Sequence, residues 1–140
     1  DYLDWLGSNF TESENTRERL EASSLAIKSH EQELVELVLN GAEDIVGLRN
    51  NEEIRIIGNP ASTAREGVVS FFQKNKSSSI IVEELRQRRS RVHIRKDDHY
   101  CGNILRPLNQ KDCIRFSICH YNSKAEVVEF MKAINEISAN

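Results

Sequence analysis

The sequence has few cysteines, few prolines and no long apolar run. Three cysteines in 140 residues, without Cys-x-x-Cys spacing, argue against a disulfide framework and favour a reducing compartment, so we expect a cytoplasmic protein. No apolar run approaches the roughly 18 residues that a membrane-spanning helix needs. The first residues also lack the basic and apolar regions of a signal peptide. We therefore expect no membrane partner.

An excess of charge of one sign is also missing. The chain has 19 basic and 22 acidic residues, a net charge of -3, which argues against a dedicated nucleic-acid surface. The cations between Arg86 and Lys96 fit a helix C-terminus and a solvated surface better than a nucleic-acid patch. With 39% hydrophobic and 29% charged residues, the chain is typical of one globular domain.

Apolar spacing predicts two helices in the first third of the chain. A long helix should run from about Thr16 to Asn40, because apolar residues recur there three and four positions apart, and Gly41 should end it. Residues 1–7 should form a short apolar helix with Gly7 just past its end. A helix this short is not stable by itself in water, so this segment is interpreted as the end of a larger structure.

The rest of the chain alternates strands and helices. Strands are expected at 54–58, 68–72, 92–94 and 113–119, and helices at 80–89 and from Ser123 to about residue 137. Ser123 and Glu126 form a capping-box pattern at the start of the last helix. This order predicts an α+β two-layer sandwich, with a small, mostly antiparallel sheet and helices packed on one face.

Cysteine and histidine offer few candidates for chemistry. Cys101 lies in a polar loop beside His99 and near several cations, surroundings that favour a reactive thiolate, although an incidental loop cysteine would look the same. Cys113 and Cys119 lie within a predicted strand and are interpreted as inert packing residues. The histidines and cysteines match no standard zinc-ligand spacing, so no metal site is expected.

Arg115 stands alone in the apolar strand that starts at Cys113. Alternation places Ile114, Phe116 and Ile118 on one face of that strand and Arg115 on the other. An arginine that faces away from the core can simply be exposed. An arginine that lines a cleft is suited to bind a carboxylate through two parallel hydrogen bonds. The residues alone leave both readings open.

Three segments together resemble the C-terminal part of class V aminotransferase-like proteins, the fold-type-I pyridoxal 5′-phosphate (PLP) enzymes that include cysteine desulfurases and selenocysteine lyases. They are His99-Tyr-Cys-Gly-Asn-Ile-Leu105, Cys-Ile-Arg115-Phe-Ser, and His-Tyr121-Asn122-Ser123 with the following Glu126-Val127. The resemblance covers about residues 16 to 137.

The resemblance implies a division of the polypeptide. Residues 1–14 would be the end of a connecting helix and a linker from a large PLP-binding domain, and residues 15–140 the C-terminal small domain. The large domain would hold PLP, so we expect no cofactor-binding residue in this chain and no turnover by this chain alone. The whole protein is expected to be a homodimer acting on an amino acid.

The resemblance also implies roles for four residues. Cys101 would carry sulfur as a persulfide, Arg115 would bind the substrate α-carboxylate, and His99 and Asn122 would help to bind substrate. Desulfurases place a second histidine and an alanine around that cysteine, where this chain has Tyr100 and Gly102. The reaction therefore stays open between desulfurase, lyase and transaminase.

An alternative of another class is a non-catalytic α+β module that binds a protein partner. It would dock through the apolar side chains of its first helix, which are Tyr2, Leu3, Trp5 and Leu6.

Overall fold

A computed structural model describes residues 1–61, 63 and 65–139 of the chain, so the expected domain end at Asn140 lies outside the described residues. The succession of short helix, long helix, two strands, helix, two strands and helix confirms the predicted order. A β1–β2 hairpin and the short helices α4 and η2 were not predicted. In chain order, the elements are α1 (Tyr2–Gly7), α2 (Thr16–Asn40), β1 (Gly41–Ala42), β2 (Ile45–Val46), β3 (Ile54–Ile57), β4 (Val68–Gln73), α3 (Ser78–Gln87), β5 (His93–Lys96), α4 (Gly102–Leu105), η2 (Arg106–Leu108), β6 (Asp112–Ser117) and α5 (Lys124–Ala139).

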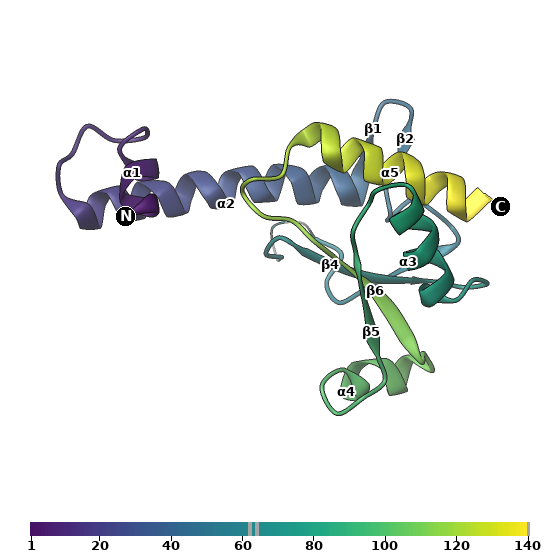
Figure 1. Cartoon of the computed structure of the whole chain (residues 1–140). Helices are drawn as coiled ribbons and strands as arrows, with labels where there is room; N and C mark the ends of the chain where they lie inside the picture. Colours follow the sequence, from purple (N-terminus) through teal and green to yellow (C-terminus); the bar gives the residue numbers. More distant parts are fainter. Residues whose placement is uncertain (62, 64, 140) are drawn as a thin grey trace.

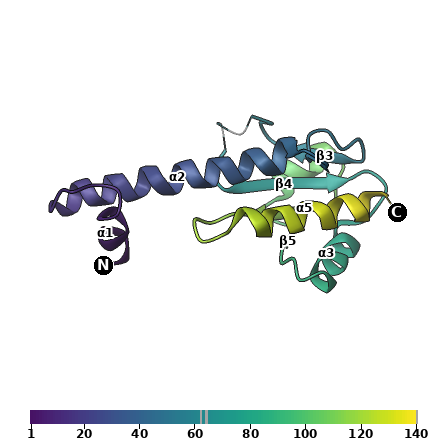
Figure 2. The same ribbon diagram turned by 90° about the horizontal axis from the view of Figure 1, so that it is seen from above.

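The main sheet has four strands in the order β3-β4-β6-β5, and every neighbouring pair is antiparallel. Helices α2, α3 and α5 cover one face of this sheet (Figures 1 and 2). Their apolar side chains pack with Val69, Phe71 and Ile114 from the two central strands in one core. The predicted α+β sandwich with helices on one face is confirmed.

Helix α5 illustrates how local sequence sets this packing. The Ser123 backbone N–H donates to Glu126 Oε2 at 2.7 Å, and the Glu126 N–H donates to Ser123 Oγ at 3.2 Å, which confirms the capping box. The apolar stripe that follows is buried against the sheet. Its members are Val127, Phe130, Met131, Ile134 and Ile137.

Strand β6 ends at Ser117, two residues before its predicted end. The Cys119 N–H donates to Asn122 Oδ1 at 2.9 Å, so it is not available to continue a ladder. Ile118 N–H donates to the Gly67 carbonyl at 2.6 Å, directly beyond the last β4–β6 pair. Residues 118–122 therefore form a tight corner that leads into α5.

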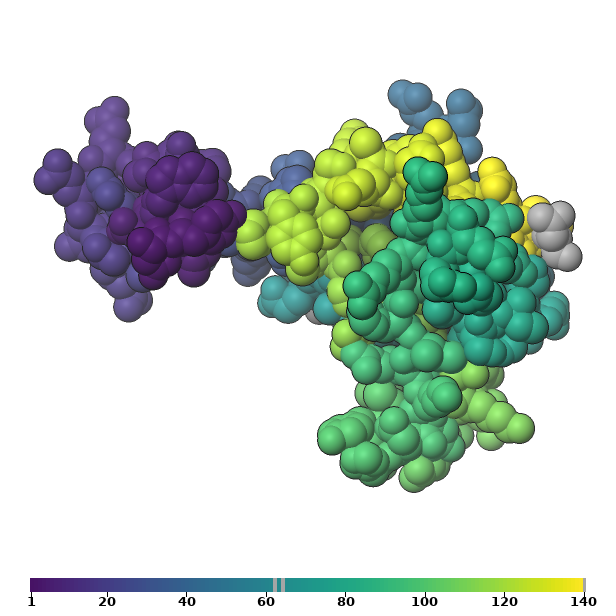
Figure 3. Space-filling model, in the orientation of Figure 1, coloured from purple at the N-terminus to yellow at the C-terminus, as the bar shows by residue number. Residues whose placement is uncertain are grey.

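Helix α1 and the first half of α2 form a projecting arm (residues 1–29), which stands away from the sheet in Figures 1 and 3. The prediction that Gly7 lies just past α1 is wrong: Gly7 is the last residue of the helix, and Ser8 is its cap. A side chain at Gly7 would overlap the Arg19 backbone, so glycine is needed because the two helices touch there.

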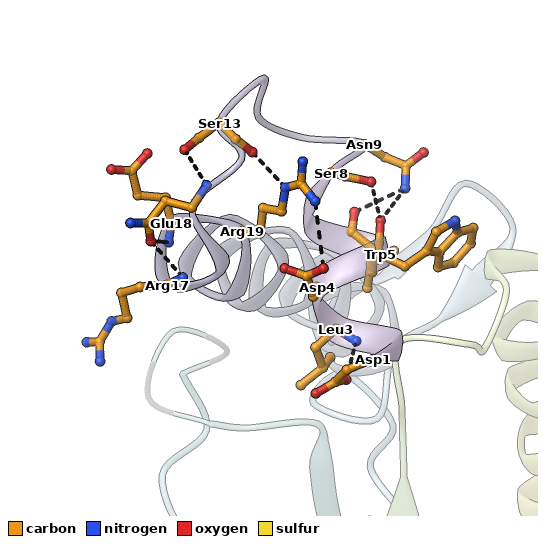
Figure 4. A network of polar contacts seen from close by, with 12 residues as sticks. Asp1, Leu3, Asp4, Trp5, Ser8, Asn9, Ser13, Arg17, Glu18 and Arg19 are labelled. Atoms are coloured by element: carbon orange, nitrogen blue, oxygen red, sulfur yellow. Dashed lines mark hydrogen bonds and ion pairs between the residues drawn. The ribbon is translucent and has the colours of Figure 1, made fainter.

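A polar network fixes α1 on α2 (Figure 4). Arg19 Nε donates to the Ser13 carbonyl at 2.6 Å, and its guanidinium lies 3.7 Å from the Asp4 carboxylate. Ser8 and Asn9 side chains both donate to the Trp5 carbonyl. None of the helices in the described part of the chain is long and apolar enough to span a membrane.

Candidate functional site

Arg115 lies in the middle of the sheet on the side without helices. Register pairs it with Ser70 of β4 on one flank and with His93 of β5 on the other. The side chain is half-buried. Its Nε is buried and has no hydrogen-bond partner among the described residues. We call this side of the sheet the open face, and Cys113 and Arg95 share it, because they pair with each other two positions along the same strands.

The cysteine loop (residues 97–101) connects β5 to α4 and has a defined shape. Asp98 Oδ1 accepts the Tyr100 N–H at 2.9 Å and the Cys101 N–H at 3.0 Å, and the Asp98 carbonyl accepts the Gly102 N–H at 2.8 Å. The Cys101 N–H, followed by the Tyr100 N–H, lowers the pKa of the Asp98 carboxyl below its usual value. The carboxylate is therefore ionised at neutral pH and fixes the backbone around Cys101.

An ion pair closes the far side of the loop. Arg106 Nε lies 2.7 Å from Asp97 Oδ1. A Cβ at Gly102 would lie 2.6 Å from both of these side chains, so the buried Gly102 allows the pair to close over the backbone. Cys101 is thus presented by a loop whose two ends are both held.

The cysteine loop and the open face together line a cavity of about 550 Å³, the loop cavity. Its lining brings Cys101 and Arg115 together, although they are 14 positions apart in the sequence. The lining residues are Ile94, Arg95, Lys96, Asp98, Tyr100, Cys101 and Arg115.

The other two predicted site residues do not line this cavity. His99 is exposed, and its ring lies 3.9 Å from the Tyr100 ring, so it is a neighbour of the cavity. Asn122 lies in the corner before α5 and lines a different cavity. Its Oδ1 accepts the Cys119 N–H, and its carbonyl oxygen lies 2.8 Å from His30 Nε2.

Three charged residues of the cavity were missed at the sequence level. Arg95 and Lys96 were counted among the cations of a helix C-terminus, but they belong to β5. The alternation in this short strand puts His93 and Arg95 on one face, but it is the β5–β6 register that makes this the face of Arg115. Asp98 stands three residues before Cys101, a spacing typical of a side chain that caps a turn.

Cys113 is buried, with 4% of its surface exposed. Burial, followed by the nearby Cys101 and Asp112, raises the pKa of its thiol to about 11. It is protonated at neutral pH, in agreement with its interpretation as an inert packing residue. Within the described ranges, no group of three or more His, Cys, Asp or Glu side chains could hold a metal ion.

The fold resembles solved structures of cysteine desulfurases and NifS-like proteins. The apo cysteine desulfurase from Thermococcus onnurineus NA1 is 22% identical, with a TM-score of 0.71, over 89% of this chain and 29% of its own. The cysteine desulfurase CsdA from Escherichia coli is 18% identical, with a TM-score of 0.62, over 89% and 31%. A NifS-like protein from Rickettsia africae ESF-5 is 16% identical, with a TM-score of 0.63, over 89% and 33%.

At these identities the likeness shows the fold, and this chain spans about a third of the length of each of those proteins. No curated protein matches the chain in sequence. The family model described as "Aminotransferase class-V" matches residues 15–130, which is most of the chain. The chain belongs to the class-V aminotransferase family.

Proposed function

We propose that residues 15–140 are the C-terminal small domain of a PLP-dependent enzyme that acts on an amino acid, and that residues 1–14 are the end of a connecting helix and a linker from its large domain. The short coverage of the solved relatives supports this division. The family match does not favour the alternative of a non-catalytic interaction module. The whole enzyme would be a cytoplasmic homodimer.

The family implies PLP in full-length members, where the cofactor supplies an electron sink for the substrate. We propose that the described residues do not form a PLP site by themselves. Six of the seven lysines are exposed. The seventh, Lys76, is half-buried and already donates to the Ile137 carbonyl at 3.1 Å, with Glu84 3.6 Å away. The cofactor would therefore be held by the large domain, and this chain alone would be inactive.

One observation carries the proposal: Arg115 Nε is buried beside the loop cavity without a partner among the described residues. A buried donor without a partner costs free energy, which an anionic ligand recovers. An α-carboxylate suits a guanidinium because it can accept two parallel hydrogen bonds. Arg115 would bind and orient the substrate, and Cys101, in the same cavity, would face its side chain and receive sulfur in a desulfurase.

The test uses the full-length enzyme with Arg115→Gln. Loss of a charge-assisted contact of roughly 1.5–3 kcal/mol predicts that KM for the amino acid rises about 10- to 100-fold. Arg89→Gln is the control, because Arg89 is an exposed arginine just after α3 that lies outside the loop cavity. An unchanged KM in Arg115→Gln would remove Arg115 from the site.

Cys101→Ala separates the possible reactions. In a desulfurase, sulfide release from cysteine should disappear in this variant while the visible PLP absorption stays. In another lyase or a transaminase, turnover should survive the substitution. A full-length protein without PLP absorption would contradict the enzyme proposal and leave the interaction module.

A further inference from the structure

A second cavity, of about 540 Å³, lies between the end of α3 and the start of α5. It shares no lining residue with the loop cavity. Phe116, which lines it, follows Arg115 in β6 and therefore points to the opposite face of the sheet, where it packs against the main core. We call it the arginine cavity, after the three arginines in its lining, Arg88, Arg89 and Arg91.

Arg89 occupies a backbone position that glycine normally takes. Its φ is 63°, in the left-handed region. The Arg89 N–H donates to the Arg86 carbonyl at 3.0 Å, and the Ser90 N–H donates to the Leu85 carbonyl at 2.9 Å, which is the hydrogen-bond pattern of a Schellman motif. Glycine is favoured at this position of the motif, because a Cβ is strained in the left-handed conformation. A side chain retained at a strained position indicates a functional use.

The fold gives the Arg89 side chain no partner. It is exposed, lines the arginine cavity and makes no hydrogen bond or ion pair with a described residue, and the same is true of Arg91. Arg88 differs from both, because it donates to the Glu84 carbonyl at 3.1 Å and lies 3.7 Å from the Glu136 carboxylate. Arg89 and Arg91 are therefore the two guanidinium groups that can receive a ligand.

The acids of the arginine cavity do not replace that ligand. Glu126 accepts the Ser123 N–H at 2.7 Å, and Glu129 lies 3.3 Å from a lysine three positions further along α5. Three arginines and two glutamates leave one positive charge in the lining. The cavity is therefore suited to a ligand with a single acid group.

Two aromatic rings form the apolar part of the cavity. The rings of Phe116 and Phe130 are stacked, with centroids 4.0 Å apart and an angle of 8° between their planes. Phe130 is buried, whereas Phe116 is only partly buried. A flat ring that packs on Phe116 would extend this stack and bury apolar surface.

We propose that the arginine cavity is a binding site for a small aromatic acid. The ring of the ligand packs on Phe116, and its acid group binds Arg89 and Arg91. The volume of the cavity lies within the range of about 300–1,000 Å³ that is usual for small-molecule sites. The site is separate from the loop cavity, so it does not rest on the proposed function.

The experiment measures binding to the full-length protein by isothermal titration calorimetry with three probes. 2-Naphthoate has the ring and the acid, 2-naphthamide has the ring without the charge, and acetate has the acid without the ring. The wild-type protein should bind 2-naphthoate about 10-fold or more tightly than either of the others, because only this probe makes both contacts. Equal binding of 2-naphthoate and 2-naphthamide would overturn the proposal.

Substitutions locate the binding. Arg89→Gly and Arg91→Gln should each weaken 2-naphthoate binding by about 10-fold and leave 2-naphthamide binding unchanged. Arg86→Gln is the matched control, because Arg86 is exposed, pairs with Glu83 at 2.7 Å and does not line the cavity. Arg115→Gln should also retain the binding, and a loss in this variant alone would place the probe in the loop cavity and overturn the assignment.

Arg89→Gly also separates binding from stability. The melting temperature of this variant should rise, because glycine relieves the left-handed strain, while its affinity for 2-naphthoate falls. A lower melting temperature would show that Arg89 serves the fold, and unchanged affinity would remove it from the site. Either result would contradict the proposal. Because the two cavities are separate, Arg89→Gln should still keep the KM for the amino acid.

Discussion

Cys113 and Cys101 lie near each other, but they have opposite environments. Cys101 lines the loop cavity, whereas Cys113 is buried below the open face. Burial raises the pKa of the Cys113 thiol from 9.0 to about 11, so the folded state holds this proton more tightly than the unfolded state does. This difference in pKa between the folded and unfolded states makes the burial of Cys113 in the sheet measurable.

The free energy of unfolding should therefore depend on pH in the alkaline range. The contribution of Cys113 to the free energy of unfolding should be complete below pH 9 and be lost as the pH rises through about 11. The reason is that the Cys113 thiol loses its proton at a lower pH in the unfolded chain than in the folded one. Urea unfolding between pH 8 and 11 should show a decline that is absent in Cys113→Val. Cys119→Ser changes a half-buried cysteine of the corner and should keep the decline in the free energy of unfolding. A wild-type free energy of unfolding that does not change between pH 8 and 11 would contradict the burial of Cys113.

At the scale of single elements, the Ser123–Glu126 capping box fixes where α5 begins. Ser123→Ala removes the hydroxyl that accepts the Glu126 N–H and should destabilise the fold by about 1 kcal/mol. Thermal unfolding followed by circular dichroism at pH 7 measures this loss.

Ser24→Ala serves as the control, because Ser24 is exposed within α2 and its side chain makes no hydrogen bond with the described residues. It should be neutral or slightly stabilising, since alanine is the better helix former. Equal melting temperatures for Ser123→Ala and the wild type would show that the cap does not hold α5 in place.

Elements specified by neighbouring residues could be predicted from the sequence. The bounds of α2 match the prediction from Thr16 to Asn40, and the Ser123 cap depends on a residue only three positions away. The end of β6 could not be predicted, because it depends on Asn122 accepting the Cys119 N–H in place of a ladder bond. Helix α4 was missed because four residues carry no periodic pattern.

The candidate site was predictable only in part, for a related reason. Cys101 and Arg115 were singled out by their residue types and by the family resemblance. Their common cavity and the inclusion of Arg95 depend on the β5–β6 register, which pairs residues 16 to 22 positions apart. Register is set by the packing of both faces of the sheet, which a single strand pattern does not define.

At the scale of the molecule, the arm contributes nothing to the main core. The buried apolar core residues begin at Leu34, in the second half of α2. Tyr2, Trp5 and Phe10 in the arm are 52%, 62% and 57% exposed. Under the proposed division, the large domain would cover these side chains.

Removal of residues 1–14 tests that division. The shortened chain, residues 15–140, should unfold in one cooperative transition with a melting temperature within a few degrees of the longer chain, because its core is intact. Loss of helicity should be confined to α1 and the first turns of α2, and hydrogen exchange can locate it. Loss of the cooperative transition would place residues 1–14 inside the domain.

Helix α2 is continuous over its 25 residues from the arm to the core. At 1.5 Å per residue it is roughly 37 Å long. Midway along it, His30 Nε2 lies 2.8 Å from the Asn122 carbonyl oxygen of the corner, so the helix contacts the segment that leads into α5. The arm and the helix layer that packs on the sheet are therefore parts of one continuous element. Under the proposed division, a large domain that covers Trp5 and Phe10 would also fix the direction of α2, and with it the position of the sheet that bears Arg115.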